Sequence, residues 1–125
     1  MAVLILKQGS YLIATIESAM TDSDARRLQT DLMTRIGSDR ATGVILDVSS
    51  MDVMDSFAGR VLRTIARASH LRGAETVMVG VQPEVAFAMV QQGMTLGDVN
   101  TALDLEQGLS VLDHRLVGRR PVDGR

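Results

Sequence analysis

The chain lacks several residue types that whole classes of function require. It has no cysteine and no tryptophan, one tyrosine and two phenylalanines among 125 residues. The absence of cysteine excludes disulfides and thiolate chemistry. Aromatic side chains, on which nucleic-acid bases stack, make up 2% of the chain, and its formal net charge of −2 does not attract a polyanion. We therefore expect no nucleic-acid partner.

Lysine and histidine are also scarce, which narrows the possible catalytic chemistry. Lys7 is the only lysine and lies in the first apolar run, which disfavours a Walker-type phosphate loop and a Schiff-base lysine. No second soft ligand stands at metal-ligand spacing from His70 or His114. Ser56 and His70 share one predicted helix, about 21 Å apart at a rise of ~1.5 Å per residue, too far for a nucleophile and its base. His114 is not excluded in this way, but we expect no enzyme activity, no metal and no cofactor.

Long hydrophobic runs are absent as well. No run approaches the ~20 residues that span a bilayer, and residues 1–6 are too short for a signal peptide and carry no basic leader. Hydrophobic residues make up 46% and charged residues 22%, a composition typical of soluble globular proteins. We expect a cytoplasmic protein without a membrane partner, with one domain over residues 1–116 and a flexible tail over residues 117–125.

Apolar runs of two kinds predict the strands. Residues 3–6 and 11–16 are joined by a short polar link that contains a glycine, which predicts an antiparallel hairpin. Residues 43–48 and 76–81 are apolar without alternation, which is typical of parallel strands buried on both faces. A short edge strand is expected near Val99.

Helical spacing and capping residues predict four helices between and after these strands. The first is capped by Thr21 or Ser23 and is expected to end at Gly37 in a left-handed conformation. The others are expected from Ser56 to about residue 72, from Pro83 to Gly93, and from a capping box at Asp104 and Gln107 to about Leu116. The order β-β-α-β-α-β-α-β-α predicts an α/β fold, a small mixed, mostly parallel sheet with an N-terminal antiparallel hairpin and about four covering helices.

One stretch, residues 47–59, joins a buried strand to the second helix. Such turns lie at the carboxyl end of the sheet, where open α/β sheets place their functional residues. Asp55 or Ser56 occupies the N-cap region, and unpaired N–H groups with the helix dipole make that position hospitable to an added phosphate. A phosphate on Ser56 would bring nearly two negative charges close to Asp52 and Asp55 and would repel a docked partner. The alternative interpretation is that Ser56 is simply a helix cap.

Apolar side chains flank this serine. Met51, Met54 and Phe57 suggest a contact surface, because flexible thioethers adapt to different partners. Alternatively, Met51 and Met54 pack inward on the sheet.

A stripe of cations follows on the second helix. Arg60, Arg63 and Arg67 share one helix line with His70, and no acid interrupts it. A solvated face with cations toward the helix C-terminus explains the pattern. The functional alternative is an assembly face for an acidic partner surface.

Several segments together resemble a known family. Residues 47–52, followed by Asp55-Ser56, resemble the phosphorylation loop of STAS domains, the anti-sigma-factor-antagonist family, in which a buried strand, an apolar-rich loop and an Asp-Ser pair open a helix. Residues 80–86 and 101–109 look very much like the RsbS-type branch, the small STAS proteins of the bacterial stressosome. The similarity runs from about Leu4 to Leu112. Phe57-Ala58-Gly59 after the serine and the tail from Val117 depart from the pattern.

The resemblance implies a function. RsbS-type proteins self-associate and co-assemble with RsbR-type STAS proteins into a scaffold that holds an RsbT-type serine kinase. The kinase phosphorylates the serine that corresponds to Ser56 and is released in the stress response, and an RsbX-type phosphatase resets the site. The resemblance thus implies a phosphoprotein in signal transduction, with Ser56 as phosphoacceptor. The expected partner-binding residues are Met51, Asp52, Met54, Asp55 and Phe57.

Other functions remain open at this point. Asp47 and Asp52 at a strand end suggest an aspartyl-phosphate receiver, although such a domain needs a lysine near the phosphate and Lys7 is poorly placed for it. Acid-stable phosphate would indicate serine, and hydroxylamine-labile phosphate would indicate aspartate. A STAS subunit of a membrane transporter is a further alternative. A hydrolase is disfavoured because no base stands near Ser56.

Overall fold

The computed structural model describes residues 3–16, 21–94 and 99–118, and the elements follow the predicted order. The helices are Asp22–Ser38 (α1), Ser56–Leu71 (α2), Pro83–Gln91 (α3) and Leu105–Gly118 (α4). The strands are Val3–Gln8 (β1), Tyr11–Ile16 (β2), Gly43–Asp47 (β3), Glu75–Val79 (β4) and Asn100–Ala102 (β5). The predicted α/β fold is therefore confirmed, and residues 119–125 of the expected tail lie outside the described residues.

The strands form one mixed sheet in the order β1-β2-β3-β4-β5. β1 is antiparallel to β2 through a tight turn, in which Gly9 has a φ of 61°. β2, β3, β4 and β5 are parallel to one another. Parallel neighbours require a crossover helix each, and α1, α2 and α3 supply these crossovers in turn.

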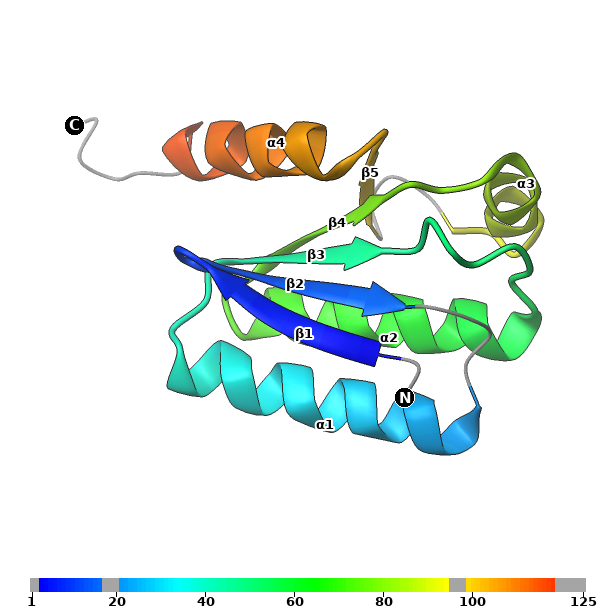
Figure 1. Cartoon of the computed structure of the whole chain (residues 1–125), viewed down its shortest axis with the longest axis horizontal. Coiled ribbons are helices and arrows are strands. Elements are labelled where there is room, and N and C mark those ends of the chain that lie inside the picture. The colour runs from blue at the N-terminus through cyan, green and yellow to red at the C-terminus, as the bar shows by residue number, and fades with distance from the viewer. Residues whose placement is uncertain (1–2, 17–20, 95–98, 119–125) are drawn as a thin grey trace.

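Helices cover the sheet on both faces. In Figure 1, α1 and α2 lie side by side under one face, α4 lies over the other, and α3 lies beyond the carboxyl ends of the strands. Val44 and Leu46 of β3 pack into the core on the α1 and α2 side, whereas Ile45 packs with Leu112 of α4. This double cover explains why Val44, Ile45 and Leu46 follow one another as apolar residues without alternation.

The end of α1 differs from the prediction. Gly37 does not terminate the helix, which continues to Ser38, with Asp39 as its C-cap. The left-handed residue is Arg40, with a φ of 50°. The Ala41 N–H donates to the Ile36 carbonyl at 3.1 Å, which closes the helix in a Schellman motif. The left-handed residue therefore lies three positions beyond Gly37, and a non-glycine residue adopts the strained conformation.

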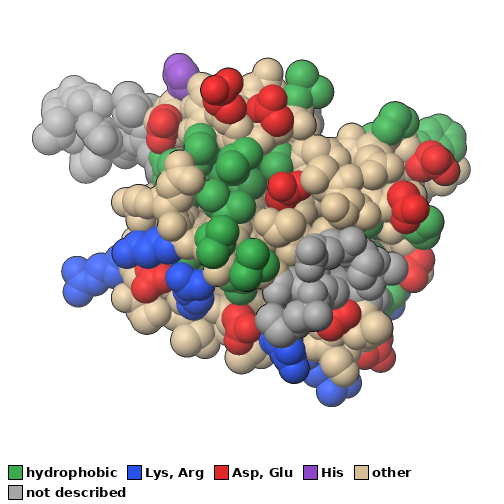
Figure 2. Space-filling view, viewed as in Figure 1, with side chains coloured by type: hydrophobic (Ala, Val, Ile, Leu, Met, Phe, Trp, Pro, Cys, Tyr) green, Lys and Arg blue, Asp and Glu red, His purple; other side chains and the backbone are tan. Residues whose placement is uncertain are grey.

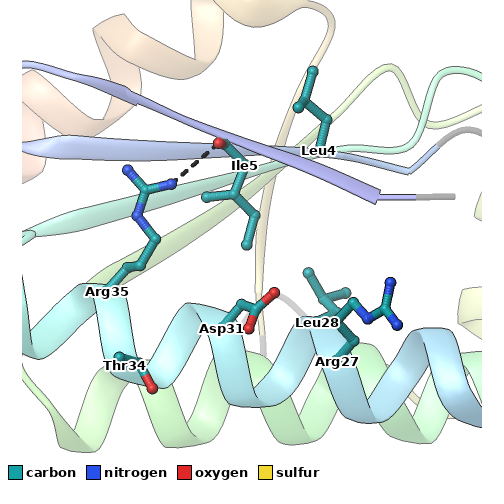
Figure 3. Close-up of a pocket in the computed structure, with 7 residues that line it drawn as sticks. All are labelled: Leu4, Ile5, Arg27, Leu28, Asp31, Thr34 and Arg35. Atoms are coloured by element: carbon teal, nitrogen blue, oxygen red, sulfur yellow. Dashed lines mark hydrogen bonds between the residues drawn. The ribbon is translucent and has the colours of Figure 1, made fainter. Parts of the chain in front are cut away.

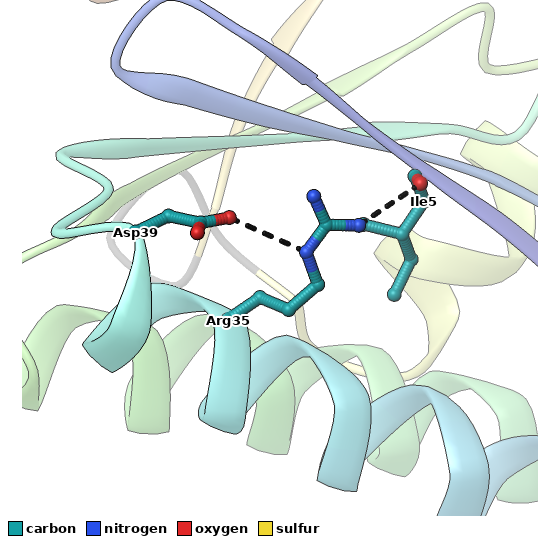
Figure 4. A network of polar contacts seen from close by, with 3 residues as sticks. All are labelled: Ile5, Arg35 and Asp39. Atoms are coloured by element: carbon teal, nitrogen blue, oxygen red, sulfur yellow. Dashed lines mark hydrogen bonds and ion pairs between the residues drawn. The ribbon is translucent and has the colours of Figure 1, made fainter.

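Arg35 ties α1 to the edge strand of the sheet. Its guanidinium donates to the Ile5 carbonyl at 3.1 Å and pairs with Asp39 at 3.3 Å (Figure 4). A hollow of about 320 Å³ lies between β1 and α1, and Figure 3 shows Ile5 pointing toward α1 while Leu4 points away from it. An arginine on an edge-strand carbonyl occupies a group that could otherwise pair with another chain.

A second tie joins the hairpin to α4. The Tyr11 hydroxyl of β2 donates a short hydrogen bond to the Asp113 carboxylate of α4. Burial, followed by this hydrogen bond and the negative charge of Asp113, raises the pKa of Tyr11 to about 12. The phenol therefore stays protonated near neutral pH and remains a donor.

Candidate functional site

The connection from β3 to α2 begins with a side-chain-capped turn. Asp47, the last residue of β3, accepts hydrogen bonds through Oδ1 from the Ser49 N–H at 3.0 Å and from its hydroxyl at 2.7 Å. This Asx-type turn redirects the chain at the carboxyl end of the sheet. The Met51 N–H then donates to the Val48 carbonyl at 2.9 Å. The aspartate considered for a receiver is thus engaged in shaping the loop.

Asp55, rather than Ser56, caps helix α2. Its Oδ1 accepts from the Ala58 N–H at 2.8 Å, and its backbone is extended. Ser56 is the first residue of α2, and it is exposed. The interpretation of Ser56 as a simple cap is therefore wrong, because the neighbouring carboxylate performs that role. Ser56 stands at the carboxyl edge of the sheet and is exposed to solvent.

The first turn of α2 carries no acidic residue, so the positive end of the helix dipole is compensated by the cap alone. The side chains of Asp52 and Asp55 are exposed nearby in the chain. The positive end of the helix dipole would therefore attract a phosphate added to Ser56, whereas the carboxylates of Asp52 and Asp55 would repel it. We expect the fold to tolerate such a group, and its charge to act mainly on whatever lies against this edge.

The methionines are not surface residues. Met51 is 1% exposed and Met54 5% exposed, and both belong to the core on the α1 and α2 side. Their expected place in a partner surface is corrected to the inward-packing alternative, since both pack in the core with Val48 while the loop residues between them are exposed. Phe57 is half-buried, and Val53, which the sequence argument passed over, is the exposed apolar residue of the loop, at 62%.

The arginines of the stripe on α2 differ in their exposure to solvent. Arg60 and Arg67 are exposed, but Arg63 is half-buried and its Nη2 donates to the Gln92 carbonyl at 2.9 Å. Arg63 thus joins α2 to the end of α3 within the chain. The assembly role of the stripe stays a prediction.

Two glutamines that sequence reasoning missed also reach this loop. Gln82 donates through Nε2 to the Ser49 carbonyl at 2.6 Å, and Gln92 donates to the Met54 carbonyl at 3.1 Å. Gln82 lies in the segment 80–86 that carries the family resemblance, but nothing in that segment indicates a contact with the loop, and Gln92 stands in no motif.

The other expectations concern metals, bases and membranes. Within residues 3–16, 21–94 and 99–118, no group of three or more His, Asp or Glu side chains is placed to hold a metal ion. His70 lies at the far end of α2 from Ser56, with its Nδ1 at 3.5 Å from Glu75.

Among the helices that the structure describes, none has the length and hydrophobicity to cross a bilayer.

The cap assignment predicts a stability difference. We expect Asp55→Ala to lower the free energy of unfolding by about 1 kcal/mol, because the Ala58 N–H loses its partner. Asp55→Asn should retain most of the stability, since its amide oxygen can accept the same bond. Ser56→Ala is the matched control and should change stability little. Urea unfolding measures all three, and an equal loss in Asp55→Ala and Ser56→Ala would contradict the assignment.

Comparisons with known proteins show which family has this architecture. The STAS domain family matches residues 2–107. The RsbT co-antagonist protein RsbRA of Bacillus subtilis (strain 168) is 26% identical over 110 residues, which are 85% of this chain and 39% of RsbRA. The related RsbRD of the same organism is 23% identical over 86 residues, 69% of this chain and 31% of RsbRD. The chain thus spans less than half the length of these two curated relatives.

Two solved structures are similar over nearly their whole length. A serine-to-glutamate variant of RsbS from Moorella thermoacetica is 32% identical, with a TM-score of 0.82 over 92% of this chain and 97% of that one. A chain from a structure of the stressosome, described as a signal integration and transduction hub, is 33% identical, with a TM-score of 0.77 over 94% and 100% of the two chains. With the strand order, the Asp-Ser helix start and the family match in agreement, the chain belongs to the STAS domain family and is similar to RsbS.

Proposed function

We propose that this protein is a non-enzymatic scaffold that holds an RsbT-type serine kinase and releases it when Ser56 is phosphorylated. The observation that carries the proposal is the exposure of Ser56, one residue beyond the Asp55 cap. The hydroxyl is not needed for the cap, lies at the carboxyl edge of the sheet and is reachable by a visiting enzyme.

The proposed reaction is phosphoryl transfer from ATP. A bond forms between Ser56 Oγ and the γ-phosphorus, the bond from that phosphorus to the ADP oxygen breaks, and the serine proton passes to a base of the kinase. The product carries nearly two negative charges at an edge where Asp52 and Asp55 are already exposed. A kinase surface docked there must then bury a dianion beside carboxylates, which weakens its binding.

The proposed partners follow from the comparisons. RsbRA and RsbRD are described as RsbT co-antagonists, and one similar structure is that of a stressosome. By similarity we propose that this chain also acts on an RsbT-type kinase, co-assembles with an RsbR-type STAS protein and is reset by an RsbX-type phosphatase, in the cytoplasm.

An exposed apolar strand supports the assembly part of the proposal. Leu4 and Leu6 of the edge strand β1 are 52% and 54% exposed. Figure 2 shows hydrophobic side chains gathered in a band below α4. Apolar side chains on a sheet edge are a feature of association surfaces.

Intact-mass analysis tests the proposed reaction. After incubation with an RsbT-type kinase and ATP, we expect the mass to rise by one phosphoryl group, and fragmentation should place it on Ser56. The phosphate should survive acid and resist hydroxylamine. A hydroxylamine-labile phosphate on Asp47 or Asp52 would favour the receiver alternative and overturn the proposal.

A further inference from the structure

Both ends of helix α3 contact the loop that precedes Ser56. Gln82 is the N-cap of α3 and Gln92 is its C-cap. The side-chain amide of Gln82 donates to the Ser49 carbonyl at 2.6 Å, near the start of the loop. The amide of Gln92 donates to the Met54 carbonyl at 3.1 Å, at the end of the loop. One helix therefore holds two backbone carbonyls on either side of residues 50–53.

The Gln92 side chain occupies a site that α2 leaves open for it. A Cβ added at Gly59 would lie 1.8 Å from the Gln92 Oε1, so only glycine leaves room for the amide over this turn. The Gln92 carbonyl in turn accepts from Arg63 at 2.9 Å. Backbone and side chain of Gln92 are thus both fixed against α2, and the amide is held toward Met54.

The chain that leads into Gln82 also packs closely against the loop. A Cβ added at Gly80 would lie 2.6 Å from the Ser49 Cβ and 3.0 Å from its Cα, so the link from β4 to α3 packs directly against the loop. Gln82 is half-buried at this contact. The Ser49 carbonyl that it binds belongs to the turn that Asp47 shapes.

We infer that α3 braces the phosphoacceptor loop, with Gln82 and Gln92 as positioning residues for Ser56. Met54 directly precedes the Asp55 cap, so a fixed Met54 carbonyl fixes the backbone that enters α2. Without this bond, the first turn of α2 opens more often, and a kinase must order the loop when it binds. The ordering cost falls on substrate binding rather than on phosphoryl transfer. The inference rests on the proposed function for its kinetic consequence only.

Hydrogen exchange tests the brace without any kinase. The Ala58 N–H donates to the Asp55 side chain and the Gly59 N–H to the Asp55 carbonyl, so their exchange reports opening of the first turn. In Gln92→Glu, which keeps the shape but loses the donor, we expect these two amides to exchange about fivefold faster. Gln91→Glu makes the same charge change on an exposed neighbour and should leave their exchange unchanged. Equal exchange in the two variants would overturn the brace.

A neutral variant and a kinetic measurement complete the test. Gln92→Met removes the donor without adding charge, so the same acceleration is expected if Gln92→Glu does not fold. Phosphorylation of Gln92→Met by an RsbT-type kinase should show a KM raised about fivefold with kcat unchanged. A lowered kcat at unchanged KM would contradict a positioning role. If the unmodified chain is never phosphorylated on Ser56, the proposed function fails, and exchange at Ala58 and Gly59 still decides the brace.

Discussion

Ser56→Ala should abolish phosphoryl transfer to the chain and keep the kinase bound in the presence of ATP. The expected change is complete, because the variant lacks the accepting oxygen. Ser56 is exposed and Asp55 supplies the cap, so the substitution should change the free energy of unfolding by no more than about 0.5 kcal/mol. Size-exclusion chromatography of the complex, before and after ATP is added, measures retention of the kinase.

Ser50→Ala provides the matched control for this experiment. Ser50 is an exposed serine of the same loop, and the variant should be phosphorylated and should release the kinase as the unmodified chain does. Phosphate on Ser56→Ala together with release of the kinase would contradict the assignment and direct attention to the other loop serines.

Gly80→Ala should cause a large loss of stability, about 3 kcal/mol. Gly80 has a φ of 73°, which costs a residue with a side chain about 1–2 kcal/mol. The new Cβ would also lie 2.6 Å from the Ser49 Cβ and 3.0 Å from the backbone Cα, which cannot rotate away. Urea unfolding measures the free-energy change directly.

Gly73→Ala separates these two causes. Gly73 has a φ of 89°, but a Cβ there would meet nothing within 4 Å. We expect the free energy of unfolding of this variant to fall only by the cost of placing a side chain at a positive φ, about 1–2 kcal/mol. Equal losses at Gly73 and Gly80 would show that the close approach of the β4–α3 link to the loop does not matter for stability.

The strands and their order along the chain could be predicted because the relevant signals are local. Residues 44–46 are successive apolar residues, as in a strand that is buried on both faces, and the link around Gly9 is a short polar turn between two apolar runs. Each observation concerns neighbours in the chain. The order of the strands within the sheet was not predicted, because the right-handed crossover rule does not determine which parallel strands become neighbours. The position of Ser56 could be predicted for the same reason, because a helix start after a buried strand lies at the carboxyl edge.

Two details were misplaced for different reasons. The α1 C-terminus was misplaced because the left-handed position, which usually favours glycine, is occupied by Arg40, and the local hydrogen bond from Ala41 to Ile36 closes the helix there. Met51 and Met54 are buried because the loop folds back over the core, which composition alone does not reveal. A methionine in a loop fits a contact surface and a core equally well.

The hydrogen bonds from Gln82 and Gln92 to the loop could not be predicted from the sequence, for a related reason. Gln82 and Ser49 are 33 positions apart, and Gln92 and Met54 are 38 apart. A glutamine at either end of a helix is common, and its side chain gains a specific role only when the fold brings a carbonyl within reach. Gly59 gives a local hint, since glycine inside a helix is unfavourable unless a neighbour needs the space.

The affinity of the kinase for the two forms of the protein tests the central claim most directly. Isothermal titration of an RsbT-type kinase into unmodified protein and into protein phosphorylated on Ser56 gives both dissociation constants under the same conditions. We expect phosphorylation to weaken binding about 100-fold or more, because a dianion beside Asp52 and Asp55 costs several kcal/mol when buried. Equal dissociation constants for the two forms would contradict the account.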